Sequence, residues 1–375
     1  MCETLTSLTH PVDESGLQPT SCLRVALVAP SLRQLLGGQE VQADLLVRCW
    51  LPDSELDVVF VPNNPEFPKW LRHVEDIPYV RTLVRFPFYL IALWRATTDA
   101  EIVHAFSASH SSFLLAPVPA WIVARVRRKK TLINYHSRLA AEHLRESGIA
   151  RRILSRTDRI VVPSEFLVGI FRDFGIKAIA IPNVVDLTQF AYRQRFPIRP
   201  LLLCTRNFDH YCGVDIVVRA FSKVKQAIPE ARLVLVGKGE EEGAIRNLVR
   251  DLDLRDVEFT GAIARDKVAE FYANAHIFVN GSRSDNMPVS ILESFACGLP
   301  VVTTAAGGIP YVVKDGVTGL LCDTEDWAAL ARNVIRVVND QHLAFTLSHN
   351  AHEQSLTYQW QNVRNSWMNV YKSLI

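Results

Sequence analysis

Two acids frame a short apolar run late in the chain, Asp285 and Glu293 in the stretch DNMPVSILE. Pro288 suits the first turn of a helix, where its missing N–H costs nothing. Gly298, followed by another proline, predicts the end of that helix. Asp285 therefore falls on the loop before the helix and Glu293 about a turn and a half into it. We expect both carboxylates to face one pocket.

The first turn of this helix offers a second kind of contact. The backbone N–H groups of Val289 and Ser290 have no partner within the helix and attract anions. The carboxylates can accept hydrogen bonds from sugar hydroxyls, and the neighbouring backbone amides can bind phosphate. A nucleotide sugar carries both kinds of group. Two solvated acids on a capped helix would explain each feature alone, but not their combination with the glycine pair Gly307–Gly308 that follows.

Another glycine pair, Gly37 and Gly38, precedes a helical pattern near the start of the chain. Paired glycines allow backbone N–H groups to approach an anion at a helix start. A plain tight turn accounts for this pair equally well. We include both glycines among the candidate donor-binding residues.

The elements that must position these residues are short apolar runs that alternate with helical patterns. Near-continuous β-branched runs spaced by helices indicate parallel sheets covered on both faces, so the sequence predicts an α/β fold, twice over. Six runs fall in each half, at 24–30, 56–62, 101–106, 131–136, 158–163, 177–182, 199–205, 232–237, 256–261, 275–280, 299–304 and 318–323. Doubly wound sheets bind ligands at the carboxyl ends of their strands, where a cleft between the two domains would lie.

The chain divides at a polar stretch with two prolines, residues 192–200, which resist regular structure. We expect a loose arm at 1–21, one Rossmann-like domain at 22–192 and a second at 193–356. The last segment, 357–375, has a helical apolar period and needs a partner surface. Its apolar positions are Val363, Trp367, Val370, Tyr371 and Leu374.

Composition excludes several classes of protein. The 375 residues are 49% hydrophobic and 21% charged, with a net charge of +2, as in an ordinary globular chain. The seven cysteines form no Cys-x-x-Cys pair, so neither a disulfide framework nor a zinc site is indicated. The apolar stretches at 86–94 and 113–126 are too short to span a bilayer, and the first twenty residues lack the pattern of a signal peptide.

Basic residues concentrate in one segment, 121–177, which holds thirteen Lys and Arg against five Asp and Glu. A solvated helix end is the simpler interpretation of such a cluster. The alternative is a surface that meets anionic lipid or an anionic acceptor, because basic clusters are attracted to both.

The sequence resembles the retaining glycosyltransferases of family 4, which have the GT-B fold. The most specific part is the spacing from Asp285 to Glu293, followed by ACGLPVV and GGIP. Further matches are IPNVVD at 181–186, LVLVGKG at 233–239 and VEFTGAI at 257–263. The resemblance covers nearly the whole chain.

The resemblance implies a role for each matching residue. Glu293 matches the acid that holds the ribose hydroxyls of the donor, and Asp285 the acid that holds hydroxyls of the donor sugar. His136 matches a histidine near the reacting carbon, and Arg206 the arginine that binds the diphosphate. Ile263 falls in the loop whose backbone meets the base. His136, Asp285 and Arg206 are thus the candidate catalytic residues.

The same resemblance implies an architecture and an activity. Two domains face a central cleft, and the C-terminal helix crosses back onto the first. A hexosyltransferase of this kind moves a sugar from a nucleotide sugar to a lipid-linked or small-molecule acceptor with retention, without metal or other cofactor. We expect it in the cytoplasm or at the membrane, in cell-envelope polysaccharide synthesis, with no nucleic acid partner.

Three positions depart from the family pattern. Asp285 is one methylene shorter than the usual Glu, and Tyr311 replaces a Glu after GGIP. Cys212 stands where the family has a lysine beside the diphosphate. Three nearby cations are possible substitutes: His210, Arg283 and Lys238.

These departures leave a second interpretation open, a non-catalytic relative or partner subunit that binds nucleotide sugars. Glu293, Arg206 and His136 favour the active enzyme. A sugar-nucleotide epimerase of similar shape lacks the support of the motif that begins at Asp285.

Overall fold

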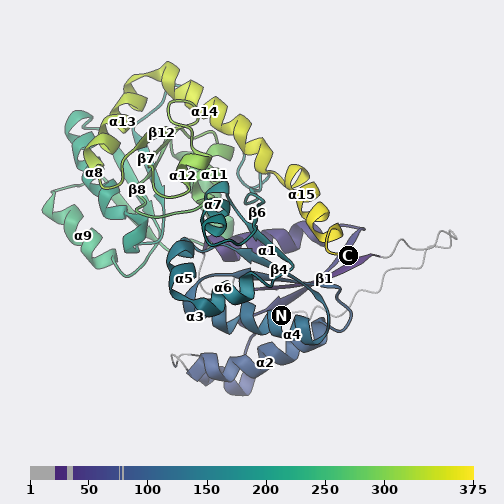
Figure 1. Ribbon diagram of the computed structural model, residues 1–375. Coiled ribbons are helices and arrows are strands. Elements are labelled where there is room, and N and C mark those ends of the chain that lie inside the picture. Colours follow the sequence, from purple (N-terminus) through teal and green to yellow (C-terminus); the bar gives the residue numbers. More distant parts are fainter. Residues whose placement is uncertain (1–21, 32–36, 76, 78–79) are drawn as a thin grey trace.

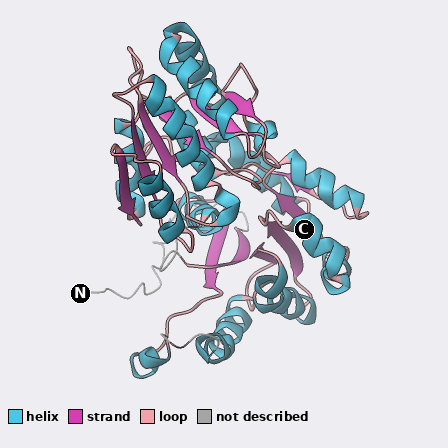
Figure 2. Cartoon of the chain, turned by 90° about the vertical axis from the view of Figure 1, so that its left-hand side faces the viewer, coloured by secondary structure: helices cyan, strands magenta, loops and turns pink. Residues whose placement is uncertain are grey.

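The computed structural model describes residues 22–31, 37–75, 77 and 80–375 (Figure 1). The predicted N-terminal arm, 1–21, lies outside the described residues. Figures 1 and 2 show two lobes, each a sheet with helices packed on both of its faces.

The first lobe contains a six-stranded parallel sheet of order β2-β1-β3-β4-β5-β6. Its strands are β1 (Leu23–Ala29), β2 (Leu56–Pro62), β3 (Ile102–Ser107), β4 (Lys130–Tyr135), β5 (Arg159–Val162) and β6 (Ile179–Ala180). Its helices are α1 (Gly38–Trp50), α2 (Val80–Ala96), α3 (His110–Leu115), α4 (Pro117–Val126), α5 (Ala140–Glu146), α6 (Gly148–Leu154) and α7 (Glu165–Asp173), with a 3₁₀ turn at Lys69–Val74.

The second lobe repeats this plan with the order β12-β11-β10-β7-β8-β9. Its strands are β7 (Leu201–Thr205), β8 (Arg232–Val236), β9 (Val257–Gly261), β10 (Ile277–Asn280), β11 (Val301–Thr304) and β12 (Leu320–Cys322). Its helices are α8 (Val214–Ala227), α9 (Glu242–Asp251), α10 (Arg265–Asn274), α11 (Val289–Ala296), α12 (Ile309–Val312), α13 (Trp327–Asn339) and α14 (Gln341–Ser355), with 3₁₀ turns at His210–Cys212 and Leu356–Tyr358.

These sheets confirm the predicted α/β class and all twelve predicted strands. The central strands are buried along their whole length, as β3, β10 and β11 show, which is why their sequences are apolar without alternation. All strand pairs within the two sheets are parallel. The carboxyl ends of neighbouring strands therefore lie at one edge of each sheet.

The chain passes from the first sheet to the second through residues 181–200, which form no helix or strand. It returns through α15 (Trp360–Lys372), which Figure 1 shows lying against the first lobe. All five predicted apolar positions of this segment are buried there with β1 and β3 residues such as Val25 and Phe106. The predicted crossover helix is thus confirmed.

One polar contact fixes α15 on the sheet. The hydroxyl of Tyr371 lies 2.8 Å from Nδ1 of His104, a fully buried residue of β3. Arg364 adds a pair of hydrogen bonds to Asp53, at 2.5 and 3.0 Å, on the loop after α1. The helix therefore adds both apolar area and specific polar contacts to the first lobe.

Candidate functional site

Loops from both lobes meet at the carboxyl ends of the strands. His136 follows β4 directly, and its backbone N–H bonds to Ser107 O at the end of β3 (2.9 Å). Its carbonyl accepts a hydrogen bond from Asn286 Nδ2 of the second lobe at 3.1 Å. Burial lowers the pKa of His136 to about 4, so its ring is neutral at neutral pH.

Arg206 follows β7 and pairs with Asp285. Its Nη2 donates to Asp285 Oδ2 at 2.5 Å, and both side chains are largely buried. The same Nη2 lies 3.6 Å from Cys212 Sγ. Burial alone would lower the pKa of the guanidinium, but the Asp285 carboxylate raises it above its ordinary value. The structure thus brings together three residues that the sequence analysis singled out.

The loop that carries Asp285 is held by the glycine pair after β11. Gly308 N donates to Asp285 O at 2.8 Å. A Cβ at Gly307, whose φ is +55°, would lie 2.3 Å from Asp285 O, and one at Gly308 would lie 2.0 Å from Asn286 O. The backbone of this pair therefore approaches the acid-bearing loop closely, and any side chain there would collide with it.

The predicted helix between Pro288 and Gly298 is present as α11. Glu293 is almost fully buried in it, and its Oε2 accepts a hydrogen bond from Tyr272 OH at 2.7 Å. Its Oε1 accepts a hydrogen bond from Arg265 at the start of α10. Burial raises the pKa of Glu293, and Arg265 and Tyr272 oppose that shift. Each carboxylate oxygen keeps a second lone pair with which it can accept a hydroxyl.

Helix starts from the two lobes lie side by side. A Cβ at Gly38, the first residue of α1, would lie 3.5 Å from Cγ2 of Val289, the first residue of α11. Two sets of free N–H groups therefore flank the same gap. Ile263 lies on the loop between β9 and α10, half-buried against the core of the second lobe.

Four buried polar atoms of this region have no hydrogen-bond partner among the described residues: His136 Nε2, Arg206 Nε, Asn286 Oδ1 and Ser290 Oγ. They come from both lobes and from adjacent loops. Seven other such atoms are scattered over the described chain, whereas these four gather where the loops of the two lobes meet. Buried polar groups are nearly always paired, so this grouping indicates that a ligand supplies the partners.

Two family models cover most of the chain between them. Residues 31–189 match the Glycosyltransferase Family 4 model, and residues 189–354 match the Glycosyl transferases group 1 model. The chain is a family 4 glycosyltransferase. The two models meet within the segment that joins the lobes.

The sequences of known proteins support the assignment of this chain to the glycosyltransferase family. It is 35% identical to N-acetyl-alpha-D-glucosaminyl L-malate synthase of Bacillus anthracis over 211 residues, 55% of this chain but only 53% of that relative. A longer match is to D-inositol 3-phosphate glycosyltransferase of Mycobacteroides abscessus, 27% identical over 97% of this chain and 87% of that relative.

A solved structure shows the fold. The Anabaena protein HepE in complex with UDP and glucose superposes with a TM-score of 0.73, at 17% identity, over 94% of this chain and 100% of that one. The GT-B architecture predicted from the sequence is therefore confirmed.

The three candidate substitutes for the missing lysine differ in their surroundings. Arg283 bonds bidentately to Asp215, at 2.7 and 2.8 Å, and contacts Glu325. His210 is exposed and lies 3.2 Å from Glu241. Lys238 is exposed and pairs with no acid in the described part of the glycosyltransferase. Arg283 and His210 thus already have acidic partners.

Sequence reasoning missed several residues of this site. Asn286 stood in the first stretch we examined, but nothing in the motif showed that it reaches His136 in the other lobe. Tyr272 and Arg265 lie seven positions apart on α10, and that helical spacing was the available signal for a shared face. Arg138, two residues after His136, stacks on Tyr211 with its guanidinium carbon 3.6 Å from the ring centroid.

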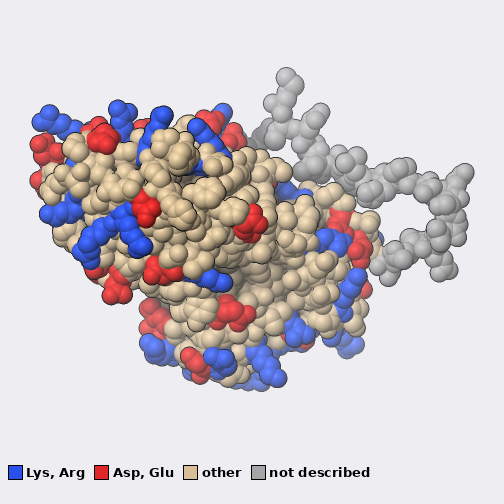
Figure 3. All heavy atoms as spheres, turned by 90° about the horizontal axis from the view of Figure 1, so that it is seen from above, with Lys and Arg blue, Asp and Glu red and all other residues tan. Residues whose placement is uncertain are grey.

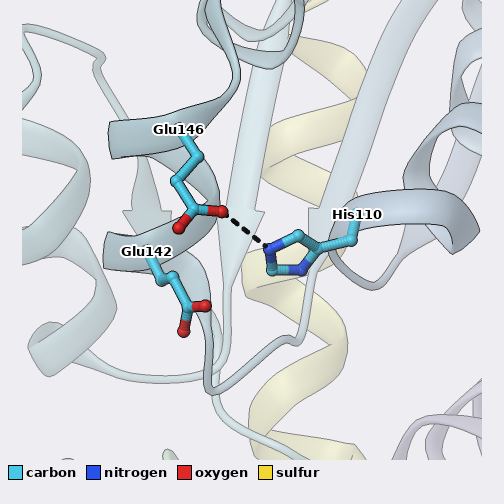
Figure 4. Close-up of side chains that lie close together, drawn as sticks. All are labelled: His110, Glu142 and Glu146. Atoms are coloured by element: carbon cyan, nitrogen blue, oxygen red, sulfur yellow. Dashed lines mark ion pairs between the residues drawn. The ribbon is translucent and has the colours of Figure 1, made fainter.

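A separate group of side chains lies at the same edge of the first sheet. His110 at the start of α3 points toward Glu142 and Glu146, one turn apart on α5 (Figure 4). His110 Nε2 is 3.5 Å from Glu146 Oε2, and both side chains are substantially exposed. Exposed acidic groups of this kind are common at protein surfaces without a bound ion, so the arrangement assigns no ligand to them.

On the face shown in Figure 3, basic and acidic side chains are interspersed. Among the described residues of the glycosyltransferase, no helix has the length and hydropathy needed to cross a bilayer.

Proposed function

We propose that this chain transfers a sugar from a nucleoside diphosphate sugar to a hydroxyl of a small-molecule or lipid-linked acceptor, with retention at the anomeric carbon. The bond between that carbon and the diphosphate oxygen breaks, and the electron pair leaves with the nucleoside diphosphate. The acceptor oxygen forms the new bond and loses its proton to the departing phosphate.

The single observation that carries this proposal is the set of four unpaired buried atoms, His136 Nε2, Arg206 Nε, Asn286 Oδ1 and Ser290 Oγ. A diphosphate accepts hydrogen bonds from Arg206 and Ser290. Sugar hydroxyls both donate and accept, so they suit Asn286 Oδ1 and either tautomer of His136. A sugar diphosphate therefore matches the chemistry of all four.

Leaving-group stabilisation falls to Arg206 and to the amides at the start of α11. Fixed positive charge aimed at the diphosphate stabilises the transition state, because negative charge builds there as the bond breaks. Arg206 is held by Asp285 at 2.5 Å. When the donor binds, the contact between Arg206 and Asp285 is partly replaced. Arg206 then contacts the diphosphate, and Asp285 accepts a hydrogen bond from a sugar hydroxyl.

Retention is supported by the side chains near the reacting position. A dedicated base on the opposite face would need a free carboxylate or a basic imidazole. Asp285 is paired with Arg206, and the pKa of His136 is lowered to about 4 by burial. The leaving phosphate is then the base that remains. A proton passed to it requires the acceptor to approach on the face that the phosphate leaves, which gives retention.

We further propose that the first lobe meets an anionic membrane. Basic side chains of the predicted 121–177 segment cluster at the end of α4, as Arg125, Arg127 and Arg128. Exposed apolar side chains accompany them on α4 and on α2, with Val126 65% and Leu83 76% exposed. Apolar groups flanked by arginines are typical of surfaces that lie in the headgroup region.

Isothermal titration calorimetry with UDP, GDP and ADP tests the proposed donor site, followed by assay of donor hydrolysis with the corresponding sugars. We expect tight binding of one nucleoside diphosphate and slow release of free sugar from its α-linked donor. Binding without turnover, with any acceptor tried, would favour the non-catalytic alternative. Failure to bind any of the three would contradict the proposal.

A further inference from the structure

Arg138 lies on the loop that joins β4 to α5, which contacts the second lobe at two points. His136 O accepts a hydrogen bond from Asn286 Nδ2 at 3.1 Å. The Arg138 guanidinium stacks on the Tyr211 ring, 3.6 Å from its centroid. This loop of the first lobe is therefore joined to the second lobe by two contacts.

The two contact points flank the candidate diphosphate site. Asn286 is the neighbour of Asp285 in the chain, and Tyr211 is the neighbour of Cys212. Arg206 Nη2 touches both of those neighbours, at 2.5 Å from Asp285 Oδ2 and 3.6 Å from Cys212 Sγ. Tyr211 O also accepts from Arg283 N at 2.9 Å, which ties its turn to the acid-bearing loop. Arg138 thus contacts the residue next to Cys212, which itself contacts Arg206.

The charge of Arg138 is free to serve a ligand. No acid in the described part of the chain pairs with it, whereas Arg283 is bound to Asp215 and Glu325. A cysteine side chain carries no positive charge, and burial raises the pKa of the Cys212 thiol, which keeps it neutral. Arg206 and the uncharged amides of α11 together bring one full positive charge to a diphosphate that carries more than one negative charge.

We propose that Arg138 supplies, from the first lobe, the second positive charge for the donor diphosphate that Cys212 does not provide from the second. This inference rests on the proposed function. The Tyr211 ring holds the guanidinium by a cation–π contact, which positions it without neutralising it. A guanidinium can also bind two phosphate oxygens at once, which an ammonium cannot do in the same way.

The test compares nucleoside diphosphate affinity and turnover in four variants: Arg138→Ala, Cys212→Lys, the double variant, and Arg219→Ala as control. Arg219 is an exposed arginine on α8 that pairs with no acid in the described chain. We expect Arg138→Ala to weaken binding about tenfold to a hundredfold, as for loss of a hydrogen bond to a charged group. Cys212→Lys in the same chain should restore most of that loss, and Arg219→Ala should change nothing.

A purely structural role gives a different pattern. If Arg138 only joins the lobes, Cys212→Lys does not relieve the Arg138→Ala defect. That result, or unchanged affinity in Arg138→Ala, would overturn the proposal. Circular dichroism checks that each variant is folded.

Two further measurements keep the outcomes distinct. If Cys212→Lys does not fold, Arg138→Lys and Arg138→Gln are compared instead. Nucleotide affinity and its salt dependence that are kept in Arg138→Lys but lost in Arg138→Gln support a role for the positive charge of Arg138. Equal losses of affinity in both variants refute that role. If the unmodified protein binds none of UDP, GDP and ADP, the proposed function fails. Binding that is indifferent to Arg138 rejects this inference alone.

Discussion

Arg206 is the side chain on which the charge balance of the candidate site depends. It is largely buried, and its carboxylate partner Asp285 keeps the pKa of its guanidinium above the ordinary value. Removing one partner of a buried pair leaves an uncompensated charge. In the proposed donor complex the diphosphate would replace Asp285 as that partner, so the arginine would stay paired.

Glu293 provides a test at the same scale. Glu293→Ala would leave Tyr272 and Arg265 without their partner, so it confounds binding with stability. Glu293→Gln keeps an acceptor for Tyr272 but removes the charge. We expect it to weaken nucleoside diphosphate binding by about 1.5–3 kcal/mol, because hydroxyl bonds to a charged acceptor are lost.

The stability of this variant has a predictable sign. The folded pKa of Glu293 is raised, so its ionised form is disfavoured by folding at neutral pH, and a neutral Gln avoids that penalty. The melting temperature of Glu293→Gln should therefore stay the same or rise. Glu270→Gln, exposed on α10, is the matched control. Nucleotide affinity equal to that of the control would remove Glu293 from the donor site.

His136 gives a prediction about turnover. We expect His136→Ala to lower turnover by at least tenfold more than it lowers nucleoside diphosphate affinity, because a contact near the reacting carbon acts mainly in the transition state. With its pKa lowered to about 4, the ring stays neutral, so turnover should show no His136 ionisation above about pH 5. Equal losses of turnover and affinity would contradict this role.

At the scale of elements, the sequence predicted all strands and the helix α11 because each depends on local signals. Continuous apolar runs specify central parallel strands, and Pro288 with Gly298 bounds α11. The partners of Glu293 did not follow from such signals. Tyr272 reaches it from another helix, and that contact depends on how α10 and α11 pack, which no local pattern encodes.

The same limit applies between lobes. The apolar period of residues 360–374 predicted that α15 needs a surface, and the family resemblance supplied which one. It did not predict that Tyr371 meets His104 at 2.8 Å, since a buried histidine inside an apolar strand carries no mark of its partner. Long-range polar pairs of this kind require the three-dimensional structure.

The docking of α15 predicts a pH dependence. Burial lowers the pKa of His104 to about 3, against about 6.5 in an unfolded chain. Between these values the unfolded chain binds a proton that the folded one does not, so the unfolding free energy falls as pH falls from about 6.5 toward 3. Each such histidine contributes at most about 1.4 kcal/mol per pH unit.

His104→Asn isolates this contribution, because asparagine does not titrate and keeps an acceptor for Tyr371. Urea unfolding at several pH values should show a shallower loss of stability below about pH 6.5 than in the unmodified protein. His349→Asn, at an exposed position of α14, should leave the slope unchanged. Parallel slopes for His104→Asn and the unmodified protein would mean that His104 is not buried as a neutral ring.

At the scale of the whole molecule, the two lobes present different surfaces. Neither α2 nor α4 contains an acid, and both carry arginines. Leu83, Ile91 and Trp94 of α2 are 76%, 51% and 48% exposed. Arg127 from the end of α4 stacks over Trp94 at 4.0 Å, which joins the two helices into one surface.

Vesicle binding tests this surface directly. The protein should sediment with vesicles that contain phosphatidylglycerol and only weakly with phosphatidylcholine alone, and added salt should reduce the binding because it screens the arginines.

Leu83→Ser removes an apolar contact, and Arg128→Ala removes a charge worth about 1 kcal/mol near an anionic surface, or roughly fivefold in affinity. Phe345→Ser is the control, since Phe345 is 41% exposed but lies on α14 of the other lobe. Because none of these residues lies in the proposed donor site, nucleoside diphosphate affinity should be unchanged in all three variants. If Leu83→Ser and Arg128→Ala bind anionic vesicles as well as Phe345→Ser does, the α2–α4 surface does not face a membrane.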